Sequence, residues 1–222
     1  MRANAHCYNC WVNKQNNPQT NFEALINSLS AQGYVICENF LPEQTILGLR
    51  DEAHKRHANL EMRAAKIGLL NQSQQSNIRG DQITWLDEQS ENSAIQAYFE
   101  QMHALRTLLN QYLFMNLQAL ETHFAIYPIG GAYQKHLDQF SHGSDAKARQ
   151  LSSILYLNND WQANDGGELR LYLNESEYLD ILPTAGKLVL FLSAKFWHEV
   201  RPAKRERASL TGWFRTRGQL LP

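Results

Sequence analysis

The periodicity of the sequence changes at about residue 118, and this change limits the folds that the chain can adopt. Before this point apolar residues recur at helical spacing, and after it short segments of alternating apolar residues follow one another. The predicted strands are 120–127, 132–138, 151–157, 167–173, 178–182, 187–193, 197–201 and 207–215. Turn residues separate them, as in Asn158-Asn159-Asp160 and Asp165-Gly166-Gly167. Such a series of short strands and turns is typical of a β-sandwich or barrel.

The first half of the chain predicts helices that support this β-structure. We expect a helix capped by Asn21, a short strand at 34–37, a second helix opened by Pro42, and a long helix capped by Ser93. Helices followed by strands indicate an α+β fold with a jelly-roll core. We expect a flexible arm over 1–20 and a single domain over 21–222, with helical support over 21–117 and the jelly-roll core over 118–216.

Composition excludes several classes of protein. The chain has 222 residues, of which 43% are hydrophobic and 19% charged, and its net charge is −1. This balance fits one globular domain and lacks the basic bias of nucleic-acid binding. No apolar run is long enough for a bilayer, and the N-terminus lacks the apolar segment of a secretory signal. We therefore expect a cytoplasmic protein without nucleic-acid or membrane partners.

Three cysteines, an odd number, argue against a disulfide framework. Cys7 and Cys10 have the spacing of a CxxC pair and follow His6. A zinc site would need further ligands at similar local spacing, and none follows. We interpret this pair as incidental to the N-terminal arm.

His136, Asp138 and His198 form a candidate iron site. His136 and Asp138 lie two residues apart in a predicted strand, so their side chains would share one face. His198 lies in a later strand, and the fold must bring it close. Two imidazoles and one carboxylate bind ferrous iron on one side and leave positions open for oxygen chemistry. A His-x-Asp pair alone also occurs by chance, so the site is a hypothesis at this stage.

Arg207 is the candidate anchor for an acidic cosubstrate. It opens the last predicted strand, where a period of two places it on one face with Ser209, Thr211 and Trp213. A charge inside a barrel is costly unless paired, and a guanidinium suits a carboxylate. Tyr156 could add a hydroxyl hydrogen bond. The alternatives are a solvated arginine in the basic stretch 201–207 and a tyrosine that belongs to the core.

The stretch from about residue 77 to residue 213 resembles a known family, the prolyl hydroxylases among the iron(II)- and 2-oxoglutarate-dependent oxygenases. The resemblance is to the branch that hydroxylates hypoxia-inducible factor in animals. The run 78–85 (Ile-Arg-Gly-Asp-Gln-Ile-Thr-Trp) resembles that branch's mobile substrate-covering loop and the strand after it. Residues 133–138 resemble the strand with the first two ligands, 156–170 the middle strands, and 198–213 the closing strands.

This resemblance implies a double-stranded β-helix and a role for each candidate residue. The iron ligands would be His136, Asp138 and His198. The distal carboxylate of 2-oxoglutarate would be held by Arg207 and Tyr156, in a pocket lined by Tyr127 and Thr211, with Trp213 near the iron. Arg79 and Asp81 would belong to the loop that closes over a peptide substrate.

The resemblance also implies an activity, which is hydroxylation of a proline in a cytosolic protein. Bacterial members similar to this chain modify elongation factor Tu, and other relatives act on a ribosomal protein or another cytosolic protein. The implied cofactors are iron(II) and 2-oxoglutarate, with ascorbate as a further candidate. We also expect a translation-related protein as the partner, a monomeric state and a role in oxygen sensing.

Three departures concern the substrate more than the iron chemistry. Tyr127-Pro128 is one residue closer to the first ligand than in the animal enzymes, the segment 139–150 is longer, and the chain ends at Pro222 with little room for a C-terminal helix. A small-molecule or free amino-acid hydroxylase therefore stays open as an alternative. A further alternative is a non-catalytic jelly-roll module that keeps a metal for structure.

Overall fold

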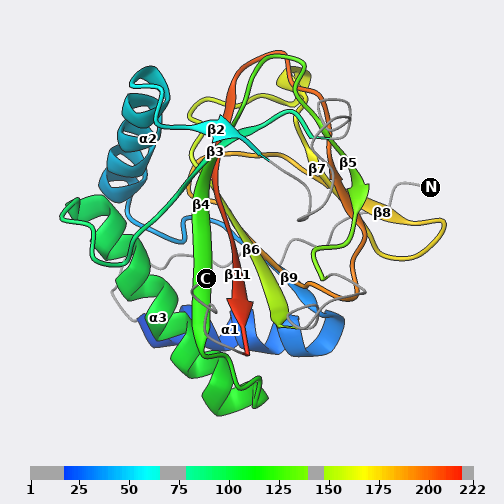
Figure 1. Cartoon of the computed structure of the whole chain (residues 1–222). Coiled ribbons are helices and arrows are strands. Elements are labelled where there is room, and N and C mark those ends of the chain that lie inside the picture. The colour runs from blue at the N-terminus through cyan, green and yellow to red at the C-terminus, as the bar shows by residue number, and fades with distance from the viewer. Residues whose placement is uncertain (1–17, 66–78, 140–147, 217–222) are drawn as a thin grey trace.

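Two antiparallel β-sheets face each other, and three helices cover the outer side of the larger sheet (Figure 1). The computed structural model describes residues 18–65, 79–139 and 148–216. The helices are α1 (Pro18–Gln32), α2 (Glu43–Ala58) and α3 (Ser93–Leu113), with a short 3₁₀ helix η1 (Ala163–Asp165). This arrangement confirms the α+β class and the jelly-roll core.

The larger sheet has the strand order β1-β9-β6-β11-β4-β3-β2. Its strands are β1 (Tyr34–Cys37), β2 (Arg63–Ala64), β3 (Gln82–Trp85), β4 (Ala119–Tyr127), β6 (Arg149–Tyr156), β9 (Leu188–Leu192) and β11 (Arg207–Arg215). The smaller sheet has the order β5-β10-β7-β8, with β5 (Tyr133–His136), β7 (Leu169–Tyr172), β8 (Tyr178–Ile181) and β10 (His198–Val200).

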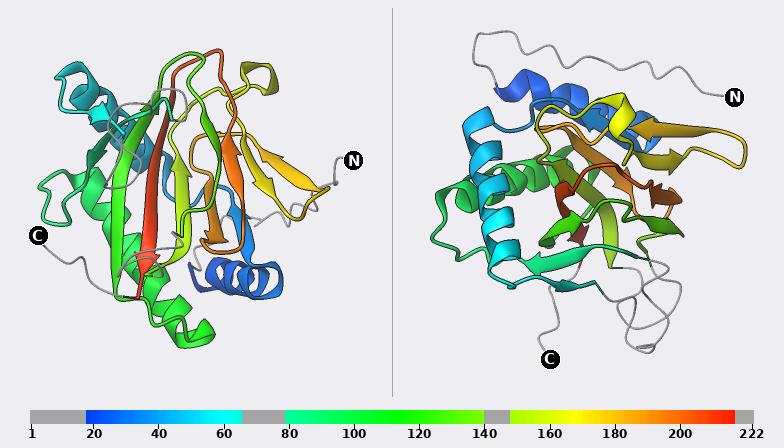
Figure 2. Two further views of the ribbon diagram at one scale, coloured as in Figure 1. Left: turned by 45° about the vertical axis from the view of Figure 1, so that its right-hand side comes forward. Right: turned by 90° about the horizontal axis from the view of Figure 1, so that it is seen from above.

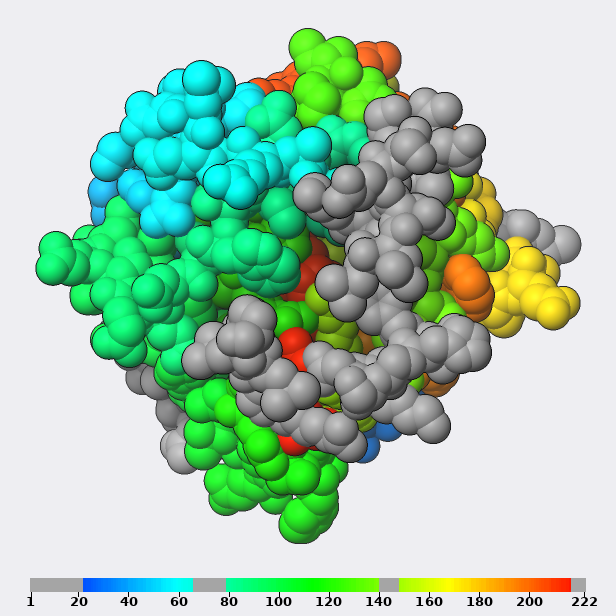
Figure 3. Space-filling model, viewed as in Figure 1, coloured from blue at the N-terminus to red at the C-terminus, as the bar shows by residue number. Residues whose placement is uncertain are grey.

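Strand β11 lies in the middle of the larger sheet, between β4 and β6, and Figure 2 shows these three long strands side by side. It pairs with β4 over its whole length, from Arg207 opposite Tyr127 to Arg215 opposite Ala119. The period of two sends Ala208, Leu210 and Phe214 toward the helices, and the alternate residues toward the smaller sheet. Atoms of β11, in red, show in the middle of the face drawn in Figure 3.

Two apolar layers hold the fold together. One lies between the larger sheet and the helices, and the other lies between the two sheets. Helix α3 contributes Ile95, Met102, Leu105 and Leu109 to the first layer, and all four are fully buried. Burial of each such side chain stabilises the fold by about 1.5–3 kcal/mol, so this apolar stripe fixes α3 on the sheet.

Several predicted boundaries shift. Helix α1 begins at Pro18, before the predicted cap at Asn21. The cap of α3 is Asn92 instead of Ser93, because the Asn92 side chain accepts hydrogen bonds from the backbone N–H groups of Ala94 and Ile95, at 3.0 and 3.2 Å. An amide oxygen reaches these free N–H groups as well as a serine hydroxyl does.

The two halves of the sequence build one sheet together. β1 pairs with β9, and β3 pairs with β4, so residues from the predicted helical support complete the larger sheet on both sides.

Most of the predicted N-terminal arm, with Cys7 and Cys10, lies outside the described residues, whereas Cys37 is buried in the core. None of the helices in the described part of the chain is long and apolar enough to span a membrane.

Candidate active site

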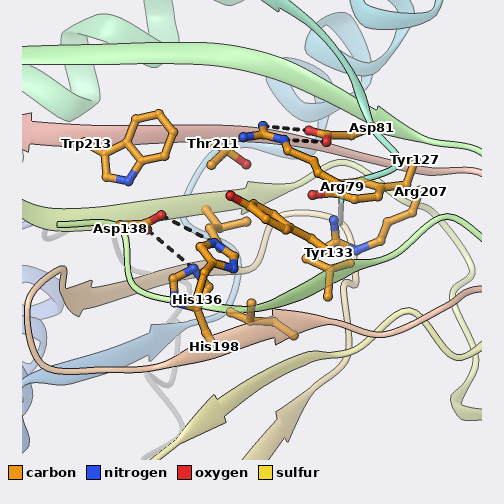
Figure 4. Close-up of a pocket in the computed structure, with 13 residues that line it drawn as sticks. Arg79, Asp81, Tyr127, Tyr133, His136, Asp138, His198, Arg207, Thr211 and Trp213 are labelled. Carbon is orange, nitrogen blue, oxygen red and sulfur yellow. Dashed lines mark hydrogen bonds and ion pairs between the residues drawn. The ribbon is translucent and has the colours of Figure 1, made fainter. Parts of the chain in front are cut away.

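His136, Asp138 and His198 converge at one end of a pocket between the two sheets (Figure 4). Pairing of β10 with β5 places His198 directly opposite His136. The Nε2 atom of His136 lies 3.6 Å from Asp138 Oδ1, and that of His198 lies 3.5 Å from Asp138 Oδ2. One ligand atom of each residue lies within 4.8 Å of the others. This is a two-histidine, one-carboxylate set with room for one cation.

The prediction that His136 and Asp138 share a strand face was wrong in its detail. β5 ends at His136, and Asp138 lies in the bend that follows. The bend turns the Asp138 side chain back toward the two imidazoles, where its carboxylate is buried. The ligand spacing therefore depends on the irregular backbone after β5 and not on strand alternation.

Both imidazoles are oriented by backbone carbonyl groups. His136 Nδ1 lies 2.7 Å from the carbonyl oxygen of Gln134, and His198 Nδ1 lies 3.1 Å from that of Phe196. A carbonyl can only accept, so each Nδ1 carries the proton and each Nε2 keeps its lone pair. Both Nε2 atoms lie beside the Asp138 carboxylate, so one metal ion could take both lone pairs and a carboxylate oxygen.

The electrostatics of the three side chains favour a cation. Burial lowers the pKa of His198 to about 4, against the opposing charge of Asp138, so this imidazole is neutral at neutral pH. For Asp138, burial raises the pKa, but His198, His136 and the Ser152 hydroxyl together hold it well below its usual range. A neutral imidazole and an ionised carboxylate are the forms that bind divalent metals.

Arg207 lies away from the three ligands, at the other side of the same pocket (Figure 4). Its side chain is 1% exposed, and its Nε donates to the Gly167 carbonyl at 3.0 Å. The guanidinium carbon lies 5.0 Å from the ring centroid of Tyr156 and 5.2 Å from that of Tyr127. Within the described ranges, its Nη2 has no hydrogen-bond partner and no acidic side chain pairs with it. A buried cation without an anion costs several kcal/mol.

The tyrosines beside Arg207 are hydrogen-bond donors. The Tyr156 hydroxyl is buried and, like Arg207 Nη2, lacks a partner among the described residues. Burial raises the pKa of Tyr156 to about 12, against the opposing charge of Arg207, and burial also raises the pKa of Tyr127 far above its ordinary value. Both hydroxyls therefore keep their protons. A guanidinium with a protonated phenol beside it suits a carboxylate ligand.

The donor sets fit a divalent metal and an acidic ligand that spans the pocket. Alternation along β11 brings Thr211 and Trp213 into the same lining as Arg207, as predicted. Tyr156 is not part of that lining but lies directly behind it, against the guanidinium. The sheet register therefore brings together the residues predicted for the metal and for the anion.

The loop residues Arg79 and Asp81 form a largely buried ion pair at the edge of the pocket. Arg79 Nε and Nη2 donate to the two Asp81 carboxylate oxygens at 2.6 and 2.8 Å. The backbone here pairs with β5, through the bridge between Arg79 and Tyr133 and the Gly80 N–H bonded to the Ala132 carbonyl at 2.9 Å. Ile78, at the start of this predicted loop, lies outside the described residues.

Tyr133 joins this loop to the ligands, and the sequence did not single it out for a role. The Arg79 guanidinium lies 4.9 Å from the Tyr133 ring centroid. The Tyr133 ring also stacks on the His136 imidazole, with ring centroids 3.6 Å apart and an angle of 19° between the ring planes. Strand alternation could not reveal this stack, because residues three apart point to opposite faces of an ideal strand.

The sequence also missed Ser152 and Ser193, which lie behind Asp138. Ser152 Oγ donates to Asp138 Oδ2 at 2.6 Å, and the two serine Oγ atoms are 2.8 Å apart. The period of two along 152–156 places Ser152 on the same face as Tyr156. The sequence signal that could have identified Ser152 is a serine on the inward face of a strand that is otherwise apolar.

Comparison with known proteins agrees with this geometry. The sequence profile of the 2OG-Fe(II) oxygenase superfamily matches residues 122–215. A prolyl-4-hydroxylase from Pseudomonas putida is 43% identical, with a TM-score of 0.79 over 89% of this chain and 100% of that one. A Trichoplax adhaerens prolyl hydroxylase, solved in complex with a hypoxia inducible factor peptide fragment, is 26% identical, with a TM-score of 0.79 over 91% and 95% of the two chains.

Animal relatives match over most of this chain. Mouse Egl nine homolog 1 is 27% identical over 202 residues, which cover 86% of this chain but 49% of the mouse protein. The chain thus spans about half the length of that relative. Mouse prolyl hydroxylase EGLN3 is 26% identical over 206 residues, and there the match covers 82% of the relative.

The fold and the ligand set are those of the iron(II)- and 2-oxoglutarate-dependent dioxygenases. The chain belongs to the 2OG-Fe(II) oxygenase superfamily, and within it to the prolyl 4-hydroxylases related to the Pseudomonas putida enzyme and to the Egl nine branch.

Proposed function

We propose that this protein hydroxylates a proline in a cytosolic protein, with iron(II), dioxygen and 2-oxoglutarate as reactants. The observation that carries the proposal is that one pocket holds both a largely buried metal-ligand set and the buried Arg207, which no acidic side chain among the described residues pairs with. The overall reaction would convert the proline, dioxygen and 2-oxoglutarate into hydroxyproline, succinate and carbon dioxide.

The side chains divide this task between metal, cosubstrate and substrate. His136, Asp138 and His198 would hold the iron through two Nε2 atoms and a carboxylate oxygen. When bound, the iron would supply the oxygen chemistry that side chains cannot perform. Arg207 would bind the distal carboxylate of 2-oxoglutarate through its free Nη2, and the Tyr156 hydroxyl would donate to the same group. Thr211 and Tyr127 would complete the pocket wall.

The apolar lining gives the pocket a second function, which is to exclude water. Ile154, Leu169 and Val200 lie among the polar groups of the lining, and Trp213 closes it near Asp138. A water-poor site strengthens the contact between Arg207 and a carboxylate. It also directs the oxidising power of the reaction to the substrate, because few other groups are within reach.

A protein substrate is supported by the Arg79–Asp81 segment and by the relatives. The segment packs on β5 at the edge of the pocket, where a peptide would approach the iron. One relative was solved with a peptide fragment bound, and another is a bacterial prolyl-4-hydroxylase. The sequence resemblance to bacterial members makes elongation factor Tu, or another translation-related protein, the first substrate to test.

The test is a mass-spectrometric comparison of peptides from elongation factor Tu and from whole cytosol. The samples are incubated with enzyme, iron(II) and 2-oxoglutarate, and the Asp138→Ala variant serves as the control. We expect one proline to gain a single oxygen atom with the wild type and not with the variant. Succinate formed by the wild type without a modified peptide would replace this proposal with a small-molecule hydroxylase. Absence of both products would reject the enzyme.

A further inference from the structure

We propose that Ser193 and Ser152 form a one-directional hydrogen-bond relay that positions Asp138 for the metal. The inference rests on the proposed metal site and assigns two positioning residues to it. Ser152 lies on β6, and Ser193 follows the end of β9. Both serines are essentially inaccessible to solvent, with exposed fractions of 1% and 0%.

The direction of the relay follows from counting protons. Ser152 Oγ donates to Asp138 Oδ2 at 2.6 Å, and this bond uses the single proton of the serine hydroxyl. The Ser152 oxygen must then act as the acceptor in its 2.8 Å contact with Ser193 Oγ. Ser193 is therefore the donor, and the order is Ser193 to Ser152 to Asp138.

The backbone around Ser193 places this relay beside the ligand. The Ser193 N–H donates to the Gln150 carbonyl at 3.0 Å, which ties it to β6. The Gln139 N–H donates to the Ser193 carbonyl at 3.3 Å, which ties it to the bend that carries Asp138. Ser193 thus contacts both the strand that holds Ser152 and the segment that holds the carboxylate.

The relay controls the rotation of the Asp138 carboxylate. Rotation about the last side-chain bond of an aspartate has only broad preferences, so the bond alone does not set the direction of the oxygens. The bond from Ser152 fixes Oδ2, and this leaves Oδ1 3.6 Å from His136 Nε2 while Oδ2 lies 3.5 Å from His198 Nε2. Each carboxylate oxygen then lies beside one of the two Nε2 atoms. Without Ser152 the carboxylate would rotate, and the metal site would lose its shape.

The test measures cobalt(II) binding by the intact protein without 2-oxoglutarate. Affinity is obtained by titration, and the visible d–d absorption of the bound cobalt reports the ligand geometry. The variants are Ser152→Ala, Ser193→Ala and the double variant. Ser153→Ala is the matched control, because Ser153 is the next residue of β6, is equally buried at 1%, and bonds to the Gly212 carbonyl instead.

We expect Ser152→Ala to weaken cobalt binding by about 10–100-fold, as is usual for partners of metal ligands, and to shift the d–d bands. Ser193→Ala should have a smaller effect of the same kind. The double variant should bind no more weakly than Ser152→Ala, because Ser193 acts only through Ser152. Ser153→Ala should keep the affinity and spectrum of the wild type.

Three results would overturn the relay. They are wild-type affinity and spectrum in Ser152→Ala, an equal loss in Ser153→Ala, or a double variant much weaker than Ser152→Ala. If the wild type itself bound no cobalt, the metal site and the relay would be rejected together. If the wild type bound cobalt but its iron form produced neither succinate nor hydroxyproline, the proposed function would fail while the relay would be judged on affinity alone.

Discussion

The phenol ring of Tyr133 lies nearly parallel to the imidazole of His136, 3.6 Å away from centroid to centroid. The same ring lies under the Arg79 guanidinium at 4.9 Å. Two parts of the site therefore contact the same aromatic ring. One is the Arg79–Asp81 segment, which we expect to cover the substrate, and the other is His136, the first metal ligand.

Removal of this ring should weaken metal binding. Aromatic stacking contributes about 0.5–1.5 kcal/mol beyond burial, so Tyr133→Leu should lower the affinity for a divalent metal by up to about tenfold. Tyr133→Phe keeps the stack and should bind like the wild type. Isothermal titration with manganese(II) measures both. Equal affinities for the Leu and Phe variants would show that the stack does not support His136.

Replacement of Arg207 by lysine should raise the 2-oxoglutarate requirement. Lysine keeps the charge but loses the planar fork that suits a carboxylate. A hydrogen bond to a charged group contributes about 1.5–3 kcal/mol, so half-maximal succinate formation should need at least about ten times more cosubstrate. Arg205→Ala is the control, because Arg205 is an exposed arginine two residues away that bonds to Asp160 and Asp165. An unchanged requirement in Arg207→Lys would mean that another residue anchors the cosubstrate.

Breaking the Arg79–Asp81 pair should loosen the loop and leave cosubstrate binding intact. Asp81 is 2% exposed, and removal of one partner of a buried pair costs about 3–5 kcal/mol. In Asp81→Asn we expect faster amide exchange at Gly80 and a higher KM for the protein substrate, with the same 2-oxoglutarate requirement.

Asp180→Asn is the matched control for that experiment. It breaks an exposed pair in which Arg170 makes the same two-bond contact, at 2.8 Å for both bonds. A surface pair contributes at most about 1 kcal/mol, so neither amide exchange at Gly80 nor substrate KM should change. Comparable effects of the two substitutions would contradict a special role for the loop pair.

His123 should make the protein less stable in mild acid. Its imidazole is buried between Trp85 and Trp213, and burial, helped by the charges of Arg79 and Arg149 and opposed by Asp138, lowers its pKa to about 3. The unfolded chain takes up the proton near its ordinary pKa of 6.5, before the folded chain does. The stability from the neutral imidazole is therefore full above pH 6.5 and is lost as the pH falls toward 3.

Urea unfolding near pH 7.5 and pH 5.5 measures this contribution. Over that interval the unfolded chain gains nearly one proton at His123, which corresponds to a loss of about 1.4 kcal/mol. His123→Phe keeps the aromatic packing but cannot titrate. Its unfolding free energy should fall by about 1.4 kcal/mol less than that of the wild type. Parallel losses in the two proteins would show that His123 does not titrate as burial predicts.

The sequence predicted the elements that depend on simple periodicity. Alternation along 207–215 gave the strand, its inward face and the position of Arg207, because β11 is regular and paired on both sides. The iron ligands were identified from residue type, spacing and resemblance, and they do converge. The reason given for Asp138 failed, because a bend and not a strand directs its side chain.

Contacts between elements far apart in sequence could not be predicted in this way. The hydrogen bond from Ser152 to Asp138 depends on how the two sheets face each other. The stack of Tyr133 on His136 depends on an irregular register between β5 and β10, where Tyr133 and His136, three residues apart, face Val200 and His198, two residues apart. Neither follows from spacing. The cap of α3 was also misplaced by one residue, since Asn92 and Ser93 are both good capping residues and the sequence alone does not choose between them.

The two ends of the pocket belong to different sheets. His136 and His198 are carried by the smaller sheet, and Arg207 by the larger one. Facing sheets pack about 10 Å apart, so the packing of the inter-sheet core sets how long a diacid must be to reach from one to the other. Length selectivity for the cosubstrate is thus a property of the whole sandwich. Volume changes at inter-sheet positions such as Leu179 or Val189, which do not line the pocket, would change this length selectivity.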